Sequence, residues 1–377
     1  MKFRVERDAL ADAVSWAARS LATRPTLPVL AGLLLTVDGD QLCVSGFDLE
    51  ASTEVDLEVT AGAAGQALVS GRLLADITKA LPPHPVDVTL DGARLSISCG
   101  SAKFSLPTMP VEDYPKLPTM PTTAGTVDSA EFATAVSQVA IAAGRDDTLP
   151  MLTGVRLEID GDKLTLAATD RYRLAVRELT WSPTDPTSAN AQVLVPARTL
   201  ADAAKSLSHA ETLSIALAAG GAGEGIIGFS GSTSGRASRT TTRLLDATFP
   251  AYRSLLPADW ASSAEIEVGP LVEAVKRVAL VTDRNAPVRM EFADATVSLT
   301  AGGEDEGRAE EQLEVGYEGD PITTAFNPAF LLDGLGALST SSARLLFTSA
   351  TKPVVLRPEA SSGSDYTYLI MPVRLPG

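Results

Sequence analysis

Two aspartates at matching places in the sequence are the residues best suited to do chemistry. Asp48 lies in the tripeptide Phe47–Leu49, and Asp170 lies 122 residues further on, in Thr169–Arg171. Two carboxylates can share general acid and base duties in one site. Aspartates in short connections more often accept hydrogen bonds from the backbone of a turn. The sequence favours the turn role and leaves a paired-carboxylate site as the minor alternative.

Other residues that support catalysis or ligand binding are scarce. The two histidines, His84 and His209, argue against histidine catalysis and histidine-rich metal sites. Cys43 and Cys99 stand in strand patterns, where cysteine is usually a small buried hydrophobe. The segment Gly223–Gly228 fits G-x-G-x-x-G, but no helix pattern follows it, so a dinucleotide role is disfavoured. We therefore predict no catalytic residue, no metal ion and no cofactor.

The elements that carry these residues are repeated along the chain. Thr26–Leu33 is matched 122 residues later by Thr148–Val155, and Val37–Leu42 is matched at the same offset by Ile159–Leu164. A weaker third copy runs from Asn285 to Val297. Internal repeats at a near-constant offset indicate tandem copies of one structural unit.

A second block recurs three times in the same order. Leu68–Asp76 resembles Leu194–Asp202 and Ala325–Asp333, and each reads as a strand, a turn residue and the start of a helix. Apolar residues at helical spacing predict six helices, at 8–24, 71–81, 129–145, 197–209, 270–284 and 328–338. Alternating segments predict antiparallel strands, with hairpin turns at Asp38-Gly39, Asp91-Gly92 and Asp160-Gly161. Strands and helices that do not alternate strictly indicate an α+β fold.

Linker-like segments separate the three copies. Residues 117–125 are rich in proline and threonine, and residues 256–263 contain Pro257 and two serines. The sequence therefore predicts three domains, at 1–121, 126–257 and 264–377.

The charge of the chain excludes some classes of protein. Lys and Arg total 31 against 47 Asp and Glu, so the net charge is −16, and such a surface does not coat itself with nucleic acid. Two cysteines exclude a disulfide scaffold and favour a reducing cytoplasm. The charged N-terminus and the lack of an apolar run of ~18 residues predict neither a signal peptide nor contact with a membrane.

The predicted helices are less acidic than the rest of the chain, which suggests a closed structure with the helices on one face. Six helices side by side, each ~10 Å wide, leave a hole of ~9 Å, too narrow for a duplex about 20 Å thick. Twelve helices leave ~28 Å, which admits duplex DNA with a water layer. Two chains joined head to tail supply twelve helices.

Four motifs complete the sequence evidence: Arg24–Leu30, Ala168–Ala175, Phe249–Arg253 and Tyr368–Pro376. With three repeats in this order, the whole chain resembles the bacterial DNA polymerase III β subunit family, the sliding clamps. The resemblance implies an α+β fold of three tandem DNA-clamp domains, with antiparallel sheets outside and two helices per domain lining the hole. Two chains would form a ring of six domains.

The resemblance also implies function. A sliding clamp has no catalytic activity, encircles double-stranded DNA without sequence preference as a homodimer, and confers processivity. Its implied partners are the clamp-loader ATPase that opens the ring, the DNA polymerase III α subunit that it tethers, and other replication and repair proteins. Its location would be the cytoplasm.

Three sets of residues carry over from the family. The groove that binds a short apolar partner peptide would be lined by Leu152, Thr169, Arg171, Tyr172, Arg173, Leu174, Pro250, Leu255, Pro353, Leu369, Met371, Pro372, Val373 and Arg374. Contacts with DNA phosphates would come from Arg24, Arg72, Lys79, Arg145, Arg198, Lys205, Lys276 and Arg277. The dimer contact would place Phe104 and Leu106 against Leu280 and Val281, with Arg94 and Lys103 facing Glu304, Asp305, Glu306, Glu310 and Glu311.

One departure from the family concerns the groove. Arg171 and Tyr172 stand where other members often have Gly or Ser followed by His, which predicts a more basic and narrower groove mouth. Two alternative functions are a monomeric interaction scaffold of the same three domains, and an enzyme built on Asp48 and Asp170. The molar mass in solution separates the scaffold from the clamp, and Asp170→Ala tests the enzyme.

Overall fold

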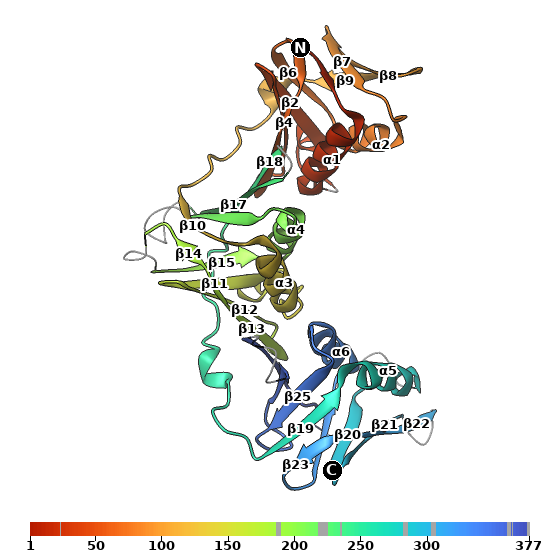
Figure 1. Cartoon of the computed structure of the whole chain (residues 1–377), viewed down its shortest axis with the longest axis vertical. Coiled ribbons are helices and arrows are strands. Elements are labelled where there is room, and N and C mark those ends of the chain that lie inside the picture. Colours follow the sequence, from red (N-terminus) through yellow and green to blue (C-terminus); the bar gives the residue numbers. More distant parts are fainter. Residues whose placement is uncertain are drawn as a thin grey trace. The chain divides into compact units, whose positions relative to one another are not determined.

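The computed structural model describes residues 1–22, 24–185, 190–217, 225–233, 236–281, 286–302, 307–359, 363 and 365–374. The chain divides into two compact units. Unit 1 consists of Met1–Ala133, Trp181–Ala191 and Arg198–Leu244. Unit 2 consists of Thr134–Thr180, Gln192–Ala197 and Leu245–Gly377. Figure 1 labels the elements of both units.

One motif, a strand, a helix and three strands, occurs six times among the described residues. The first pair of copies is β1 (Lys2–Val5), α1 (Arg7–Ala17), β2 (Gly32–Asp38), β3 (Gln41–Phe47), β4 (Ala51–Glu58), and β6 (Gly65–Ser70), α2 (Gly71–Ala80), β7 (Val86–Asp91), β8 (Arg94–Cys99), β9 (Ala102–Met109). The second pair is β10 (Thr123–Asp128), α3 (Ser129–Ala140), β11 (Gly154–Asp160), β12 (Lys163–Thr169), β13 (Arg173–Thr180), and β15 (Asn190–Pro196), α4 (Ala197–Leu207), β16 (Thr212–Leu217), β17 (Ile226–Thr233), β18 (Arg236–Arg243).

The third pair is β19 (Ser262–Glu267), α5 (Val268–Val278), β20 (Val288–Ala293), β21 (Thr296–Gly302), β22 (Arg308–Glu314), and β24 (Ile322–Phe326), α6 (Pro328–Gly336), β25 (Ser342–Phe347), β26 (Val354–Pro358), β27 (Tyr366–Ile370). Within each pair a short strand precedes the second copy: β5 (Thr60–Ala63), β14 (Ser182–Pro183) and β23 (Gly316–Glu318). The α+β class and the three tandem repeats are therefore confirmed.

The strands of each unit form antiparallel sheets. In unit 1 a 14-stranded sheet has the order β14-β10-β16-β17-β18-β4-β3-β2-β6-β9-β8-β7-β1-β5. In unit 2 a 9-stranded sheet has the order β15-β11-β12-β13-β27-β26-β25-β19-β23, and a 4-stranded sheet has the order β22-β21-β20-β24. Strands of different repeats pair at two places, which we name the first junction (β4 with β18) and the second junction (β13 with β27).

The two junctions have the same register. Thr53 lies opposite Thr240 in the first junction, and Ala175, which is 122 residues after Thr53, lies opposite Tyr368 in the second. Ala51 and Arg173, also 122 residues apart, lie opposite Thr242 and Ile370. Register is set by which face of a strand must be buried, so a shared register reflects a shared burial pattern.

The predicted hairpins form at the three Asp-Gly signals. Strands β2 and β3, β7 and β8, and β11 and β12 are joined by two-residue loops that begin at Gly39, Gly92 and Gly161. These glycines have φ of +53°, +55° and +61°, a region that favours glycine because it has no Cβ. The third repeat makes the same loop at Asp294, with φ of +52°.

The six predicted helices are present, but three end earlier than predicted. The segments 8–24, 129–145 and 270–284 end as α-helix at Ala17, Ala140 and Val278. The carbonyl of Ala17 accepts hydrogen bonds from the hydroxyls of Ser20 and Thr53, each 3.0 Å away. These hydroxyls satisfy a terminal carbonyl that has no amide partner further along the helix.

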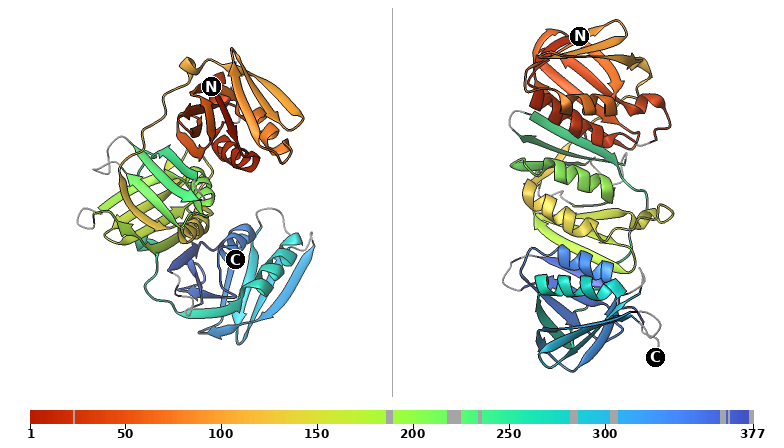
Figure 2. Two further views of the ribbon diagram at one scale, coloured as in Figure 1. Left: turned by 45° about the horizontal axis from the view of Figure 1, so that its top comes forward. Right: turned by 90° about the vertical axis from the view of Figure 1, so that its right-hand side faces the viewer.

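Each helix packs its apolar side onto a sheet. In α2, Leu74, Ala75 and Ile77 are buried, while Arg72 and Lys79 are exposed. Helices α1 and α2 contact each other in unit 1, and α5 and α6 do so in unit 2, side by side (Figure 2). Among the described residues, none of the helices has the length and apolar character needed to cross a membrane.

Candidate functional site

The loops that carry the two aspartates have one geometry. Asp48 Oδ1 accepts hydrogen bonds from the N–H groups of Glu50 and Ala51, at 2.9 and 2.7 Å. Asp170 Oδ1 accepts the equivalent bonds from Tyr172 and Arg173, both at 3.0 Å. Each carboxylate therefore closes a turn between two strands, as the sequence favoured.

The residue after each aspartate has a left-handed backbone. Leu49 has φ of +80° and Arg171 has φ of +79°. Side chains other than glycine adopt this region at a cost of about 1–2 kcal/mol, so the surrounding hydrogen bonds must hold it. Arg171 is thereby presented to solvent at the tip of the loop.

The buried side chain of Arg173 ties this loop to helix α6. Its Nε donates to Asp170 Oδ2 at 3.0 Å, its Nη1 donates to Asp333 Oδ2, and its guanidinium lies 4.5 Å from the ring centroid of Phe330. Burial lowers the pKa of Arg173, but the hydrogen bond to Asp333 and the nearby charges outweigh it, so the pKa is raised overall. Arg173 therefore supports the candidate groove from within and does not face a partner.

A buried apolar cluster lies beneath the candidate groove. It joins Leu174 of β13 and Leu369 of β27 to Phe249 and Tyr252 of the segment between the second and third repeats. Leu152 and Thr169 are also buried. These predicted groove residues therefore form its support, and their substitution would act through packing.

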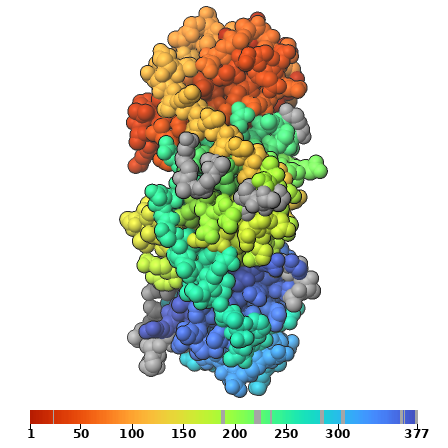
Figure 3. Space-filling view, turned by 90° about the vertical axis from the view of Figure 1, so that its left-hand side faces the viewer, coloured from red at the N-terminus to blue at the C-terminus, as the bar shows by residue number. Residues whose placement is uncertain are grey.

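A buried carboxylate fastens the connecting segment to the sheet. Glu158 accepts a hydrogen bond from Tyr252 Oη at 3.3 Å and pairs with Arg253 and, at 2.6 Å, with Arg156. Burial first, and then the charge of Glu158, raise the pKa of Tyr252 to about 12. Part of segment 245–261 is exposed on the face shown in Figure 3, while Phe249 and Tyr252 are buried. Glu158 thus fixes the position of Leu255, which lies two residues after Arg253.

Four apolar side chains above this support are exposed, and we name them the partner surface: Tyr172 (58% exposed), Leu255 (50%), Met371 (38%) and Val373 (37%). Met371 N–H donates to Tyr172 O at 2.8 Å, which joins two of them through the backbone. The remaining predicted groove residues are half-buried or exposed, namely Pro250, Pro353, Pro372, Arg171 and Arg374. All fourteen predicted groove residues belong to unit 2.

Sequence reasoning did not find three residues of this site. Glu158 stands in an alternating strand, where a carboxylate reads as solvent-facing, and only its pairing with the Phe249–Arg253 motif identifies it. Phe330 and Asp333 lie on α6, and Phe330 stacks on Tyr172 with ring centroids 6.1 Å apart. The signal that could have identified Asp333 is that Arg173, if buried, needs a carboxylate partner.

The candidate DNA-contacting bases fall into three groups. Arg72 and Lys79 of α2, and Arg198 and Lys205 of α4, are exposed and seven residues apart, so each pair lies on one helix face. Lys276 and Arg277 of α5 are exposed but pair with Glu273 and Glu311. Arg24 and Arg145 lie in loops beyond the helix ends, so the predictions that place them in helices 8–24 and 129–145 are wrong.

The candidate dimer residues lie in or beside β9, which stands between β6 and β8 in its sheet, and β22, which is an edge strand among the described residues. Lys103, Phe104 and Leu106 belong to β9, and Arg94 of the neighbouring β8 donates to Ser105 Oγ at 2.8 Å. Leu280 (82% exposed) and Val281 follow α5, close to the edge strand β22. Glu310 and Glu311 belong to β22, whereas Glu304, Asp305 and Glu306 lie outside the described residues, as do Gly223 and Glu224 of the glycine-rich segment.

Comparison with known proteins identifies the family. Sequence models of the DNA polymerase III beta subunit match in chain order: the N-terminal domain over residues 1–118, the central domain over 126–251 and the C-terminal domain over 253–374. The beta sliding clamp of Streptomyces coelicolor is 56% identical over 381 residues and all of both chains. The beta sliding clamp homolog GriR of Streptomyces muensis is 44% identical over 99% of both chains.

Solved structures agree with the sequence comparison. A sliding clamp of Pseudomonas aeruginosa bound to griselimycin superposes with a TM-score of 0.90 at 27% identity, and the Bacillus subtilis clamp with a TM-score of 0.90 at 25% identity. Both alignments cover all of each chain. With its three repeats in order, this chain belongs to the DNA polymerase III beta subunit family, the beta sliding clamps.

Proposed function

We propose that two copies of this chain close head to tail around duplex DNA and tether the replicative polymerase to it. The family is one of processivity factors and not of enzymes. Each copy contributes three domains, at 1–121, 126–257 and 264–377. A clamp loader opens the ring in the cytoplasm, and the DNA polymerase III α subunit and other replication and repair proteins then bind it.

The observation that carries this proposal is the shared register of the two junctions. In each, the fourth strand of one repeat pairs with the last strand of the next repeat, β4 with β18 and β13 with β27. The same strand of the third repeat is β22, which is the edge of its sheet among the described residues. The last strand of the first repeat is β9, and in the part of the chain that the structure describes its segment 102–107 pairs with β8 on one side only. An unpaired edge is a template for another strand, so β22 of one protomer and β9 of its partner complete a third junction.

We extend the register of the internal junctions to the third one. In this proposal Lys103 lies opposite Glu310, and Phe104 lies opposite Ala309. In the first junction the equivalent pair is Arg239 and Glu54, which form an ion pair at 2.8 Å. In the second, Tyr368 lies opposite Ala175, again an aromatic residue facing an alanine. Charge pairs at such an edge set the register more than the affinity.

Exposed apolar residues beside these edges support the same contact. Leu280 and Val281 follow α5, as Arg19 and Ser20 follow α1. Arg19 donates to Ser206 Oγ across the first junction, so Leu280 is placed to cross the third. Glu304 and Glu306, together with Arg94, are proposed as flanking charges of this interface.

The DNA contacts are proposed to be weak and sequence-independent. Arg72, Lys79, Arg198 and Lys205 are exposed at matching positions of two helices, where they can meet phosphates without reading bases. Arg24, Arg145, Lys276 and Arg277 are proposed as further contacts. Loose, salt-sensitive contacts suit sliding, and the net charge of −16 disfavours binding on the outer surface.

The partner surface supports the tethering role. Burying a Leu or a Phe of a partner peptide there would contribute about 1.5–3 kcal/mol each. Two such anchors give reversible binding, which suits the exchange of partners.

Retention on circular and linear DNA tests the proposal. Once loaded on a nicked circular duplex, the protein should remain bound in high salt and leave after a single cut linearises the DNA. The molar mass should be near twice 39.2 kDa. Equal retention on both forms, or a mass of one chain at every concentration, would contradict encirclement and favour a monomeric scaffold.

A further inference from the structure

The second junction is filled by three side chains from three elements. Arg173 of β13 lies between the carboxylates of Asp170 and Asp333, against the ring of Phe330. Tyr368 of β27 donates its hydroxyl to Phe330 O at 2.8 Å. The arginine and the two rings thus pack together as one plug, held by two carboxylates.

The first junction carries small residues at the same three places. Register and helix position give the equivalences: Ala51 for Arg173, Thr240 for Tyr368, and Thr199 for Phe330 as the third residue of its helix. Each substitution removes a long or aromatic side chain, so the first junction lacks the plug.

Both carboxylates that hold the plug are kept in the first junction. Asp48 is equivalent to Asp170, and Asp202 to Asp333 as the sixth residue of its helix. Asp48 uses Oδ1 for its turn, which leaves Oδ2 for another donor. The structure shows no hydrogen bond or ion pair of the Asp202 carboxylate with the residues it describes.

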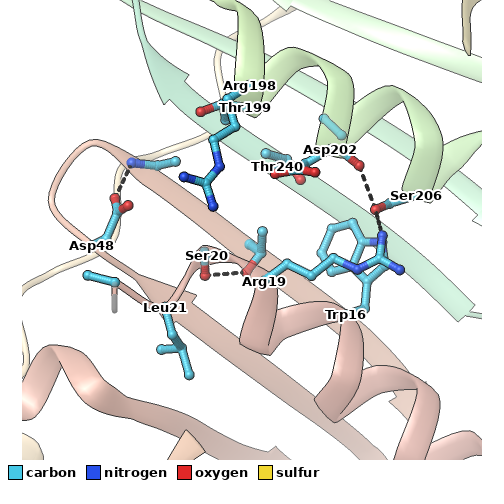
Figure 4. A pocket seen from close by; sticks show the side chains of 14 residues that line it. Trp16, Arg19, Ser20, Leu21, Asp48, Arg198, Thr199, Asp202, Ser206 and Thr240 are labelled. Carbon is cyan, nitrogen blue, oxygen red and sulfur yellow. Dashed lines mark hydrogen bonds between the residues drawn. The ribbon is translucent and has the colours of Figure 1, made fainter. Parts of the chain in front are cut away.

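A cavity of about 190 Å³ is found where the plug is missing. Asp48 and Asp202 line it together with Ala51, Thr199 and Thr240, all within unit 1 (Figure 4). Its volume is roughly that of six water molecules, enough for a long side chain.

A buried donor in the wall of this cavity also lacks a partner. Trp16, the tenth residue of α1, is nine-tenths buried, and its Nε1 has no hydrogen-bond acceptor. Gln138, the tenth residue of α3, donates from Nε2 to the carbonyl of Ala337 at 2.9 Å. Because this nitrogen is itself closed off from solvent, it can report on a ligand in the cavity only through its neighbours in the wall.

Two arginines of the wall bear on the charge of the occupant. Arg19 is engaged with Ser206, whose hydroxyl donates to Asp202 O at 2.6 Å. Arg198 extends from the first turn of α4 into the cavity (Figure 4) and is exposed. The lining has two positive side chains, Arg19 and Arg198, and two negative ones, Asp48 and Asp202, so its charges cancel. The cavity therefore favours a cation only after Arg198 turns out to solvent.

We propose that this cavity binds an arginine side chain of a partner peptide. The guanidinium would lie between Asp48 and Asp202, as that of Arg173 lies between Asp170 and Asp333, and a neighbouring aromatic side chain would take the place of Phe330 and Tyr368. This inference depends on the comparison of the two junctions and not on the clamp function.

Binding of a dipeptide to the full-length protein tests the proposal. The probe is acetyl-Phe-Arg-amide, and its matched control is acetyl-Phe-citrulline-amide, which has the same shape without the charge. The readouts are calorimetry and the NMR signal of the Trp16 indole N–H, assigned with Trp16→Phe. We expect the arginine peptide to shift this signal and the citrulline peptide to bind at least tenfold more weakly, since a charged hydrogen bond is lost.

Four variants establish the site. Asp48→Asn and Asp202→Asn should each weaken binding about tenfold. Ala51→Arg should abolish it, because it restores the plug of the second junction, and Thr240→Tyr should reduce it if Ala51→Arg fails to fold. Arg198→Ala should strengthen binding several-fold by removing the competing cation.

The sign of the Arg198→Ala effect decides between a cation and an anion. An anion site would bind inorganic phosphate, and Arg198→Ala would abolish that binding. Phosphate binding of this kind, equal affinity for the citrulline peptide, or an unchanged affinity in both Asn variants would overturn the proposal.

Discussion

At the residue scale, the two repeated aspartates show how one sequence position acquires different duties. Asp48 and Asp170 accept the same two backbone hydrogen bonds, and the residue that follows each has a left-handed backbone. Asp170 also holds the buried guanidinium of Arg173. The repeat offset predicted their equivalence, but not the extra duty, because that depends on a helix 160 residues further along the chain.

Alanine substitutions at the two positions should differ in their cost. Asp48→Ala loses an acceptor for two backbone N–H groups, and we expect the free energy of unfolding to fall by about 1 kcal/mol. Asp170→Ala also strips one partner from a buried arginine, and we expect a loss of about 3 kcal/mol or more. Urea unfolding followed by circular dichroism measures both.

Asp170→Asn is the matched control, because its amide oxygen still accepts the backbone bonds. Its loss should lie between those of the two alanine variants. Equal losses for Asp48→Ala and Asp170→Ala would mean that Arg173 does not depend on Asp170. An Asp170→Asn protein that is stable but inactive in replication would instead revive the enzyme alternative.

At the element scale, patterning predicted the strands and hairpins better than the helix ends. Alternation and Asp-Gly signals have a local cause, so the hairpins at Gly39, Gly92 and Gly161 form as predicted. Helix ends depended on tertiary partners, such as the Thr53 hydroxyl that takes the carbonyl of Ala17. Arg24 and Arg145 therefore lie in loops and not on helices.

The pairing of strands between repeats was beyond local patterning. The sequence of β18 contains no pattern that predicts its pairing with β4, since more than 175 residues separate the two strands. The two internal junctions share one register, and the third junction that we propose extends this register by the repeat. Family resemblance predicted residues for the dimer contact, and the register that we propose for them is extended from the two internal junctions.

Engineered cysteines test that register. In the proposed junction Phe104 lies opposite Ala309, where Cα atoms of antiparallel partners are about 4.5–5.5 Å apart. Phe104→Cys with Ala309→Cys should therefore form an intermolecular disulfide under mild oxidation, seen as a dimer in non-reducing gels. Phe104→Cys with Glu311→Cys shifts the pair by two residues to about 7–8 Å and should cross-link far less.

The single-cysteine variants control for the native thiols. Cys99 is buried, and the pKa of Cys43 is raised to about 12 by burial first and by Asp56 and Glu54. Burial therefore protects Cys99, and the raised pKa disfavours the reactive thiolate of Cys43. Efficient cross-linking of the shifted pair, with little from the aligned pair, would refute the proposed register.

At the scale of the whole molecule, repetition divides the work among surfaces of different chemistry. In our proposal, pairing with a second copy uses the backbone and the charges of β9 and β22. In the same proposal, partners bind the apolar partner surface, which rests on the ion pairs of Glu158 and Arg173 in unit 2. The two surfaces share no residue, so one can be lost without the other.

A pair of variants should separate the two functions. Deleting residues 371–377 removes Met371 and Val373 from the partner surface, and we expect loss of binding to the polymerase with a molar mass still near twice 39.2 kDa. Lys103→Glu places like charges opposite each other at the proposed junction, and we expect a mass near 39.2 kDa with the affinity for a partner peptide unchanged. Light scattering and peptide calorimetry on both proteins give the four values.

A charge exchange is the control. Glu310→Lys should restore the dimer in the Lys103→Glu background, because the two charges are then exchanged across the same register. Glu318→Lys makes the same change of charge away from β22 and should not restore it. A monomeric truncated chain would mean that the two surfaces are coupled. The same would follow if Lys103→Glu weakened peptide binding as much as dimerisation. Either result would refute the separation of the two functions between these surfaces.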